Sequence, residues 1–287
     1  MKIPPYWARA RYEGRDRQGD FRQYVACGWS FSSLLEARNQ ASARVKRIFE
    51  LFSAGQKPDF YEYHDRPIKE EIIEEIKDAG EPVAVITRNR YGALVLNCAN
   101  ALFVDVDFPK PSLSGLLSNI VWAFRRRRGQ VEAPGSNVAG IRKVEAWAGR
   151  NPGRGFRLYR TKEGLRLLFT DRLYDPASEE TAAILAELEA DPLYVRLTQK
   201  QECFRARLTV KPWRCGIPRP PSAFPWDSPK EEAVFRQWEA DYTRRDAEFK
   251  VCELIRAFGP PAKIGALKTI VDVHDRGAKI NANAPLA

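Results

Sequence analysis

Five short apolar runs in the middle of the chain predict β-strands. Three of them, "PVAVITRN", "GALVLNC" and "ALFVDVDF", follow one another with turn residues between them. The other two, "GFRLYRTK" and "LRLLFTD", flank a tight turn at Glu163 and Gly164. Short apolar segments bounded by turn residues are typical of strands, and short connections join antiparallel neighbours. We therefore expect an α+β protein with a central, mostly antiparallel sheet flanked by helices.

Apolar positions three and four residues apart predict helices around this central region. The expected helices cover residues 32–55, 68–80, 112–129 and 175–191, and a long C-terminal helix covers residues 229–257. Ser32 or Ser33 is the expected N-cap of the first helix, and Ser178 is that of the fourth, because a serine hydroxyl accepts a hydrogen bond from a free amide of the first turn.

Further strands are expected at "VACGWSFSS", "KVEAWAGR" and "CFRARLTV", whereas "QVEAPGSNVAG" is expected to be a loop or disordered. The proline-rich "GIPRPPSAFPWDSP" is typical of a linker or a surface strap. We divide the chain into an N-terminal α/β segment at 1–80, a core at 81–217, and a proline-rich strap with a helical segment at 218–287.

The charge balance points to a polyanionic partner. The chain has 287 residues, of which 44% are hydrophobic, and this is enough for a substantial core. Its 47 lysines and arginines exceed its 37 acidic residues, giving a net charge of +10. Such an excess favours nucleic acid first and an anionic membrane surface second, although a merely basic soluble protein stays an alternative.

Cysteine and histidine usage narrows the class of protein. Five scattered cysteines without a C-x-x-C pair indicate reduced thiols, as in the cytoplasm, rather than a disulfide framework. The two histidines, His64 and His274, argue against a histidine-rich zinc site. The first residues lack the apolar stretch of a signal peptide, and no 18-residue apolar run occurs, so we expect a cytoplasmic protein without a membrane partner.

The run "FVDVDF" places two acidic residues on one strand face. Asp105 and Asp107 are two residues apart, and side chains alternate between the faces of a strand. Two adjacent negative charges destabilise each other unless a cation or a shared proton neutralises them. One interpretation is a site for Mg²⁺ or Mn²⁺ with Asp105 and Asp107 as ligands. The other is a strand that emerges into solvent, with its aspartates paired to arginines.

Two basic clusters follow this acidic pair. The first surrounds the expected hairpin, where Gly164 would let a phosphate approach the backbone; its cations are Arg157, Arg160, Lys162 and Arg166. The second follows "CFRARLTV" and contains Arg205, Arg207, Lys211 and Arg214. Converging cations suit a triphosphate or a nucleic-acid backbone. A solvated basic hairpin is the alternative for the first cluster.

Together these segments resemble the catalytic core of the archaeo-eukaryotic primase and primase-polymerase superfamily, over about residues 83–216. "VDVD" is similar to its D-x-D motif, and "RTKEGLR" to its second motif, with Arg166 where the family has a phosphate-binding histidine. "CFRARLTVKPWR" is similar to its basic third motif, and Asp191 is the nearest candidate for the accompanying acid. The resemblance implies an RRM-like sheet.

This resemblance implies metal-dependent nucleotidyl transfer on a DNA or RNA template. Asp105, Asp107 and Asp191 would be the catalytic acids, with Mg²⁺ or Mn²⁺ as the cofactor. The implied clamp on the nucleoside triphosphate consists of Arg160, Lys162, Arg166, Arg205, Arg207, Lys211 and Arg214. The run Arg125–Arg128 and exposed aromatic residues would hold the template, although such a run is also common at a solvated helix end.

Three alternatives remain open. The chain is either such an enzyme or a non-catalytic protein of the same fold that binds nucleic acid and nucleotides. A magnesium-dependent phosphatase of the haloacid dehalogenase type also begins with an apolar strand ending in D-x-D, although Phe108 stands where that class has a small hydroxylated residue. A separate cluster, Asp272, His274 and Asp275, contains residue types that bind metals, but a lone histidine there is more often structural.

Overall fold

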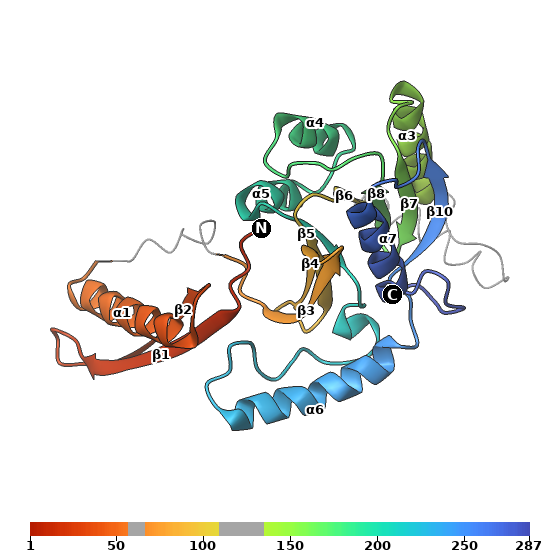
Figure 1. The fold of residues 1–287 in the computed structure, drawn as a ribbon. Helices are drawn as coiled ribbons and strands as arrows, with labels where there is room; N and C mark the ends of the chain where they lie inside the picture. Colours follow the sequence, from red (N-terminus) through yellow and green to blue (C-terminus); the bar gives the residue numbers. More distant parts are fainter. Residues whose placement is uncertain (57–66, 109–134) are drawn as a thin grey trace, which may run out of the picture.

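Three antiparallel sheets make up the fold (Figure 1). The computed structural model describes residues 1–56, 67–108 and 135–287. The first sheet is the hairpin of β1 (Tyr6–Arg15) and β2 (Phe21–Ser30). The second has the order β3-β4-β5-β9 and consists of β3 (Glu71–Asp78), β4 (Glu81–Arg88), β5 (Leu94–Cys98) and β9 (Phe204–Arg207). The third has the order β10-β7-β8-β6 and consists of β10 (Cys252–Phe258), β7 (Phe156–Thr161), β8 (Gly164–Phe169) and β6 (Phe103–Asp107).

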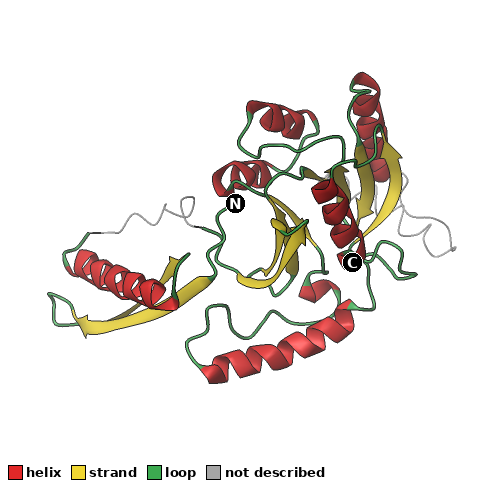
Figure 2. Ribbon diagram, viewed as in Figure 1, coloured by secondary structure: helices red, strands yellow, loops and turns green. Residues whose placement is uncertain are grey.

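The predicted α+β class is confirmed. Every pairing between these strands is antiparallel, and helices lie between and around the sheets (Figure 2). The helices are α1 (Leu34–Ser53), α3 (Gly135–Arg150), α4 (Glu179–Glu187), α5 (Pro192–Gln201), α6 (Pro229–Asp246) and α7 (Gly265–Gly277), with a 3₁₀ turn, η3, at Pro212–Arg214. The strands of residues 71–258 are divided between two four-stranded sheets, where the sequence predicted one central sheet.

The N-terminal hairpin and α1 pack directly on each other. Ser33 is the N-cap of α1, and its side chain accepts a hydrogen bond from the Glu36 amide, as expected from the sequence. Gly28 of β2 allows the close approach, because a Cβ there would lie 2.3 Å from the backbone of Ala37 and Ala41. Only a residue without a side chain fits at this crossing.

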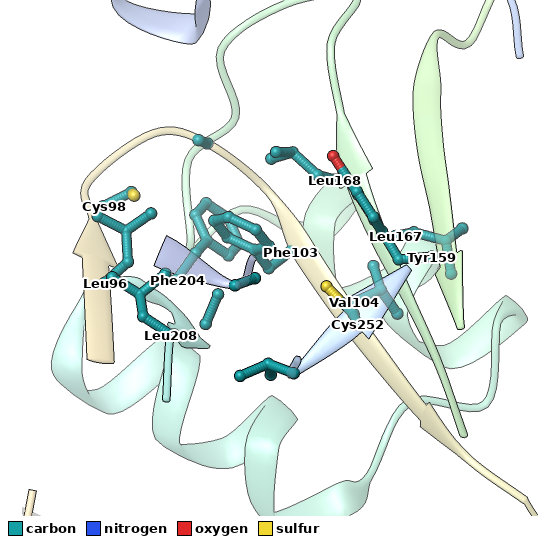
Figure 3. Close-up of a cluster of buried hydrophobic side chains, with 14 of the residues drawn as sticks. Leu96, Cys98, Phe103, Val104, Tyr159, Leu167, Leu168, Phe204, Leu208 and Cys252 are labelled. Carbon is teal, nitrogen blue, oxygen red and sulfur yellow. The ribbon is translucent and has the colours of Figure 1, made fainter. Parts of the chain in front are cut away.

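One hydrophobic core joins the two four-stranded sheets. Leu96 and Phe204 come from one sheet, Phe103 and Leu167 come from the other, and all four side chains are fully buried. Figure 3 shows Phe103 among side chains of both sheets. Because the same cluster contains residues from both, neither sheet has a separate core.

Helix α7 packs against both sheets. Near its N-terminal end, Thr269 donates a hydrogen bond to Asp78 of β3. Near its C-terminal end, the His274 ring lies 5.3 Å from that of Phe103 in β6 and 4.8 Å from that of Tyr159 in β7, between ring centroids. The helix therefore covers the face of the third sheet to which Asp105 belongs.

The helix predicted at residues 68–80 is wrong, because residues 71–78 form strand β3. Ile72, Ile73 and Ile76 have the spacing of one helix face. In the structure this spacing arises from a strand with register shifts between Ile72 and Glu74 and between Ile76 and Lys77. A bulge adds a residue to the strand and breaks the period of two on which recognition of a strand depends.

Three further predictions are corrected. Residues 143–150 belong to α3 and not to a strand, and the buried Val144 and Trp147 are three apart, as on one helix face. Residues 135–140 of the expected loop also lie in α3. The C-terminal helix begins at Pro229 as predicted but ends at Asp246, and β10 follows. No glycine or proline marks this end, and β10 is held by its pairing with β7.

The remaining expectations fall partly outside the described residues. The helix predicted at 112–129, with Arg125–Arg128, lies entirely outside them. Helix α4 and its N-cap Ser178 agree with the prediction. Across residues 1–56, 67–108 and 135–287, no helix has both the length and the apolar character needed to cross a membrane.

Candidate functional site

Asp105 is neutralised by a bidentate ion pair with Arg166. The two residues lie opposite each other on β6 and β8. Arg166 Nε lies 2.7 Å from Asp105 Oδ1, and Arg166 Nη2 lies 3.0 Å from Oδ2. The Arg166 side chain is 2% exposed and that of Asp105 is 38% exposed. This fork geometry is the strongest form of the arginine–carboxylate contact, and it engages both carboxylate oxygens.

Both members of this pair stay charged. Burial acts to raise the pKa of Asp105, but the charge and hydrogen bonds of Arg166 prevail and hold that pKa below its ordinary value. Burial likewise acts to lower the pKa of Arg166, and Asp105 raises it overall. Each ion therefore offsets the desolvation of the other.

The third nitrogen of Arg166 also has partners within the protein. Nη1 donates a hydrogen bond of 2.9 Å to the carbonyl oxygen of Arg207 and lies 3.5 Å from His274 Nε2. The side chain expected to bind phosphate is therefore covered by α7 and engaged through all its nitrogens. The sequence could not show this, because α7 is more than 90 residues away along the chain.

A second group of polar side chains continues from His274. His274 Nδ1 lies 3.0 Å from Asp275 Oδ1, which also accepts a hydrogen bond of 2.7 Å from the Tyr159 hydroxyl. Arg157 Nη2 donates to Asp275 Oδ2 at 2.6 Å, and Arg157 Nε donates to the Tyr159 oxygen at 2.7 Å. The pKa of His274 is lowered because the ring is fully buried, so it is neutral at pH 7.

This network gives the C-terminal "DVHD" cluster a structural role, which the sequence had favoured over metal binding for its lone histidine. Asp275 and His274 hold α7 to β7 and β8 through hydrogen bonds to Tyr159, Arg157 and Arg166. Within the described ranges, no three His, Cys, Asp or Glu side chains lie where together they could hold a metal ion. The residue types of this cluster suggested metal binding in the sequence. In the structure, the partners of His274 and Asp275 are side chains of strands β7 and β8.

Asp107 has surroundings quite unlike those of Asp105. It lies at the end of β6 opposite Gly164 and is exposed. Partial burial and the negative charges of Asp105, Asp191 and Glu163 raise its pKa, and Lys211 opposes them. The three predicted acids are thus close enough to influence one another, although the strand pairing places only Asp105 against the arginine.

Asp191 has a structural partner. Its side chain accepts a hydrogen bond of 2.8 Å from the Tyr194 amide and is the N-cap of α5. The Tyr194 hydroxyl donates to the carbonyl oxygen of Phe103 at 3.0 Å, which ties α5 to β6. The cap therefore explains the aspartate at this position and also places it near Asp107.

The acidic residues do not form a ready site for a divalent cation. Both oxygens of Asp105 accept hydrogen bonds from Arg166, and Asp191 is used as a helix cap. Mg²⁺ requires several oxygen ligands with free lone pairs in a nearly octahedral arrangement. In this arrangement the implied metal does not fit the residues present, so we derive no chemical step through it.

Gly164 supports strand packing instead of phosphate binding. A Cβ at this position would lie 2.1 Å from the carbonyl oxygen of Val106. The glycine of the hairpin is therefore covered by β6, and its backbone is not open to a phosphate. Arg160 and Lys162 lie at the turn of the same hairpin, close to Gly164, where Lys162 Nζ donates to the carbonyl oxygen of Leu286.

Arg205, the first cation of the second basic cluster, forms an ion pair within the protein. Arg205 Nη2 donates to both oxygens of Glu70, at 2.6 Å each. Glu70 also accepts a hydrogen bond from Thr87, whose hydroxyl oxygen accepts one from Asn97. This polar group fills a space between β4, β5 and β9, and Arg205 belongs to the structure of that sheet.

Arg207, Lys211 and Arg214 form a group of adjacent cations, here called the cation cluster. Burial and the charge of Arg166 lower the pKa of Arg207 to about 10, against the opposing effect of Asp105. Burial and the charges of Arg207 and Arg214 lower the pKa of Lys211. Arg214 forms an ion pair with Glu163, whereas neither Arg207 nor Lys211 has a carboxylate of the described residues within ion-pair distance. Two partly buried cations thus repel each other without direct compensation.

Comparison with protein-family models, with curated proteins and with solved structures finds no match.

Proposed function

We propose that this protein binds nucleic acid and nucleotides through the cation cluster, as a non-catalytic protein with a primase-like arrangement of motifs. The observation that carries the proposal is that Arg207 and Lys211 lie partly buried next to Arg214, and neither has a carboxylate of the described residues within ion-pair distance. Burial and neighbouring cations lower the pKa of both groups. A phosphate group placed between them would relieve the repulsion between these cations, because an opposite charge favours the charged form of each. The net charge of +10 supports a polyanion as the ligand.

The Asp105–Arg166 pair favours binding over catalysis. Arg166, at the position of the family's phosphate-binding histidine, occupies the carboxylate that the enzyme mechanism would assign to a metal. A guanidinium is also always protonated and cannot exchange a proton during a reaction. In this arrangement the D-x-D motif lies on a strand of a sheet, but its first aspartate pairs with an arginine and so has a structural role.

The test is binding of a labelled single-stranded 20-nucleotide DNA or RNA by fluorescence anisotropy over a range of salt concentrations. Lys211→Gln and Arg207→Gln should each weaken binding, and should reduce the slope of log K against log salt by about 1 per lost phosphate contact. Arg244→Gln is the matched control, because Arg244 is 75% exposed in a pair with Asp241 on α6. Equal affinity of Lys211→Gln, Arg207→Gln and the control would contradict the proposal.

Metal-dependent nucleotidyl transfer is the second candidate. It would require Asp105 to leave Arg166, and of the three acids only Asp107 has surroundings that favour it. This exposed carboxylate has a raised pKa beside Asp105, Asp191 and Glu163, and a cation would relieve that repulsion. Calorimetry of ATP and dATP with and without Mn²⁺, followed by primer extension, separates the candidates. Asp107→Asn is a cleaner variant than Asp105→Asn, which would leave Arg166 without its partner. Nucleotide incorporation that requires Mn²⁺ and is lost in Asp107→Asn would establish the enzyme.

The phosphatase alternative receives no support from the fold. In that class the D-x-D strand belongs to a series of parallel strands, whereas β6 pairs antiparallel with β8 and every pairing between the named strands is antiparallel. Phosphate release from a generic phosphomonoester is its direct test.

A further inference from the structure

A cluster of aromatic rings and cations adjoins the cation cluster and combines Trp213 with Tyr91 of the β4–β5 turn. Trp213 stands between Lys211 and Arg214 in η3, and its side chain is 46% exposed. The Tyr91 ring meets it edge to face, at 5.4 Å between centroids and an interplanar angle of 86°. We call Tyr91 and Trp213 the aromatic platform.

Three cations lie against this platform. The guanidinium of Arg90 is 4.7 Å from the centroid of the Tyr91 ring. Lys211 Nζ is 5.7 Å from the centroid of the Trp213 ring. The guanidinium of Arg219 is 5.9 Å from Trp213 and 6.0 Å from Tyr91. Arg219 is exposed and has no carboxylate of the described residues within ion-pair distance. Like Arg219, Lys211 has no such carboxylate, so both positive charges can contact an anion bound next to the rings.

The platform is held by a rigid turn. The Asn89 side chain accepts hydrogen bonds from the amides of Tyr91 and Ala93, at 2.9 and 3.1 Å. Gly92 has φ = +86°, and a Cβ there would lie 2.2 Å from the Trp238 ring. Because the turn is tied to α6 by this contact, Tyr91 is presented to Trp213 without the need for a loop to order on binding.

We propose that the aromatic platform stacks a base of a single-stranded nucleic acid while Lys211 and Arg219 contact its phosphates. This inference rests on the proposed function and adds a base-binding surface to it. An exposed indole next to unpaired cations matches the alternation of flat apolar bases and charged phosphates along a single strand. A duplex keeps its bases stacked inside and offers no ring face to Trp213. A proline-rich or apolar peptide would not account for the two cations.

The test compares two labelled oligonucleotides of ten residues, oligo(dT) and an abasic strand with the same phosphates, on the full-length protein. The wild type should bind oligo(dT) more tightly by about 5-fold or more, since stacking of one base on an aromatic ring contributes an affinity factor of this order. Trp213→Ala should bind both strands with the affinity that the wild type has for the abasic one. Arg219→Gln should weaken both strands together. An oligo(U) arm distinguishes RNA from DNA as the source of the base.

Phe21→Ala is the matched control, because Phe21 is 62% exposed on β2 and is not in contact with the cation cluster. Trp213→Phe keeps a ring and should retain part of the preference, and thermal unfolding of each variant checks that it is folded. Equal binding of both strands by the wild type, still salt-sensitive and unchanged in Trp213→Ala, would overturn the platform and leave the proposed function intact. Absence of salt-sensitive binding to either strand would overturn both.

Discussion

At the scale of single residues, two aspartates on the same strand face differ in their partners, and their pKa values are shifted in opposite directions. Asp105 faces Arg166 across the strand pair, and its pKa is lowered by this arginine. Asp107 faces Gly164, which has no side chain to offer, and its pKa is raised by burial and by neighbouring acids. The partner on the opposite strand therefore decides whether a carboxylate is used for structure or left open to a ligand.

Removal of Arg166 should destabilise the fold. Arg166→Met leaves Asp105 beneath α7 without its counter-charge, and we expect a loss of about 3 kcal/mol in the free energy of unfolding. This is the lower end for a broken buried pair, because Asp105 keeps part of its surface in water. Urea denaturation measures the loss. Arg244→Gln, which breaks an exposed pair, should change it by less than about 1 kcal/mol, and an equal effect of both variants would contradict the structural role of the buried pair.

His274 should make stability fall as the pH falls below about 6.5. Burial and Arg166 lower its pKa, while Asp275 and Asp105 act in the opposite direction. In the unfolded chain His274 binds a proton near pH 6.5, whereas in the folded chain it does so only at lower pH. The unfolded state therefore binds more protons, and stability falls as the pH falls. The loss from pH 6.5 to pH 5 is at most about 2 kcal/mol.

The measurement is the urea midpoint at pH 7.5, 6.5, 5.5 and 5. His274→Gln should be less stable than the wild type at pH 7.5, since its contacts with Asp275 and Arg166 change, but should show a smaller slope with pH. The lowered pKa values of Asp105 and Asp275 act only below their ordinary range, so they do not interfere. A slope that His274→Gln leaves unchanged would show that another group titrates.

At the scale of elements, β6 and β8 approach each other so closely that their pairing requires a glycine. Gly164 lies against the carbonyl oxygen of Val106 and sits opposite Asp107 in the strand pair. Helix α7 covers the neighbouring positions of the same sheet through His274. The hairpin that the sequence associated with phosphate binding is thus paired with β6 along one edge and covered by α7 on one face.

Gly164→Ala should destabilise the protein by about 1–3 kcal/mol, because the added methyl meets backbone that cannot move without breaking the β6–β8 pairing. Gly149→Ala is the control. Gly149 lies in α3, and no atom lies within 4 Å of the place that an added methyl would take. Alanine is also the better helix former, so this variant should be neutral or slightly stabilising. Thermal unfolding measures both, and equal midpoints would contradict the close packing of β6 on β8.

At the scale of the whole molecule, the two four-stranded sheets share one core, whereas the N-terminal hairpin and α1 have a small cluster of their own. The shared core includes Leu96, Phe103 and Leu167, and the small cluster consists of Ala8, Ala37 and Ala41 with Ala10 packed against it. Ion pairs of Arg9 and Arg11 with Asp227 connect the N-terminal unit to the rest. Such exposed or half-exposed pairs contribute little to stability.

Native-state hydrogen exchange should therefore show two levels of protection. Amides of β5, β6 and β8 should exchange through one common opening with the highest free energy, and those of β1 and β2 should exchange through a separate opening of lower free energy. Mass spectrometry of peptides from each segment over increasing urea gives both values. Different opening free energies for β5 and β8 would contradict the shared core.

The local pattern of the chain was sufficient to predict the helices and strands whose ends are marked by capping or turn residues. Ser33 and Ser178 cap helices where predicted, and the runs at β4 to β8 form antiparallel strands. The α+β class followed from these. Residues 71–78 and 252–257 were assigned to helices because bulges disturb the period of the first strand and only pairing with β7 stabilises the second.

For the candidate site, the sequence determined which charged residues share a strand face and which cations follow one another after β9. Only the tertiary structure decided their partners. It placed Arg166 between Asp105 and His274, Arg205 against Glu70, and Lys211 beside Arg207 without a direct counter-ion. The physical reason is that a charge is neutralised by whatever lies within a few ångströms, and here those groups come from segments 61 to 135 residues apart.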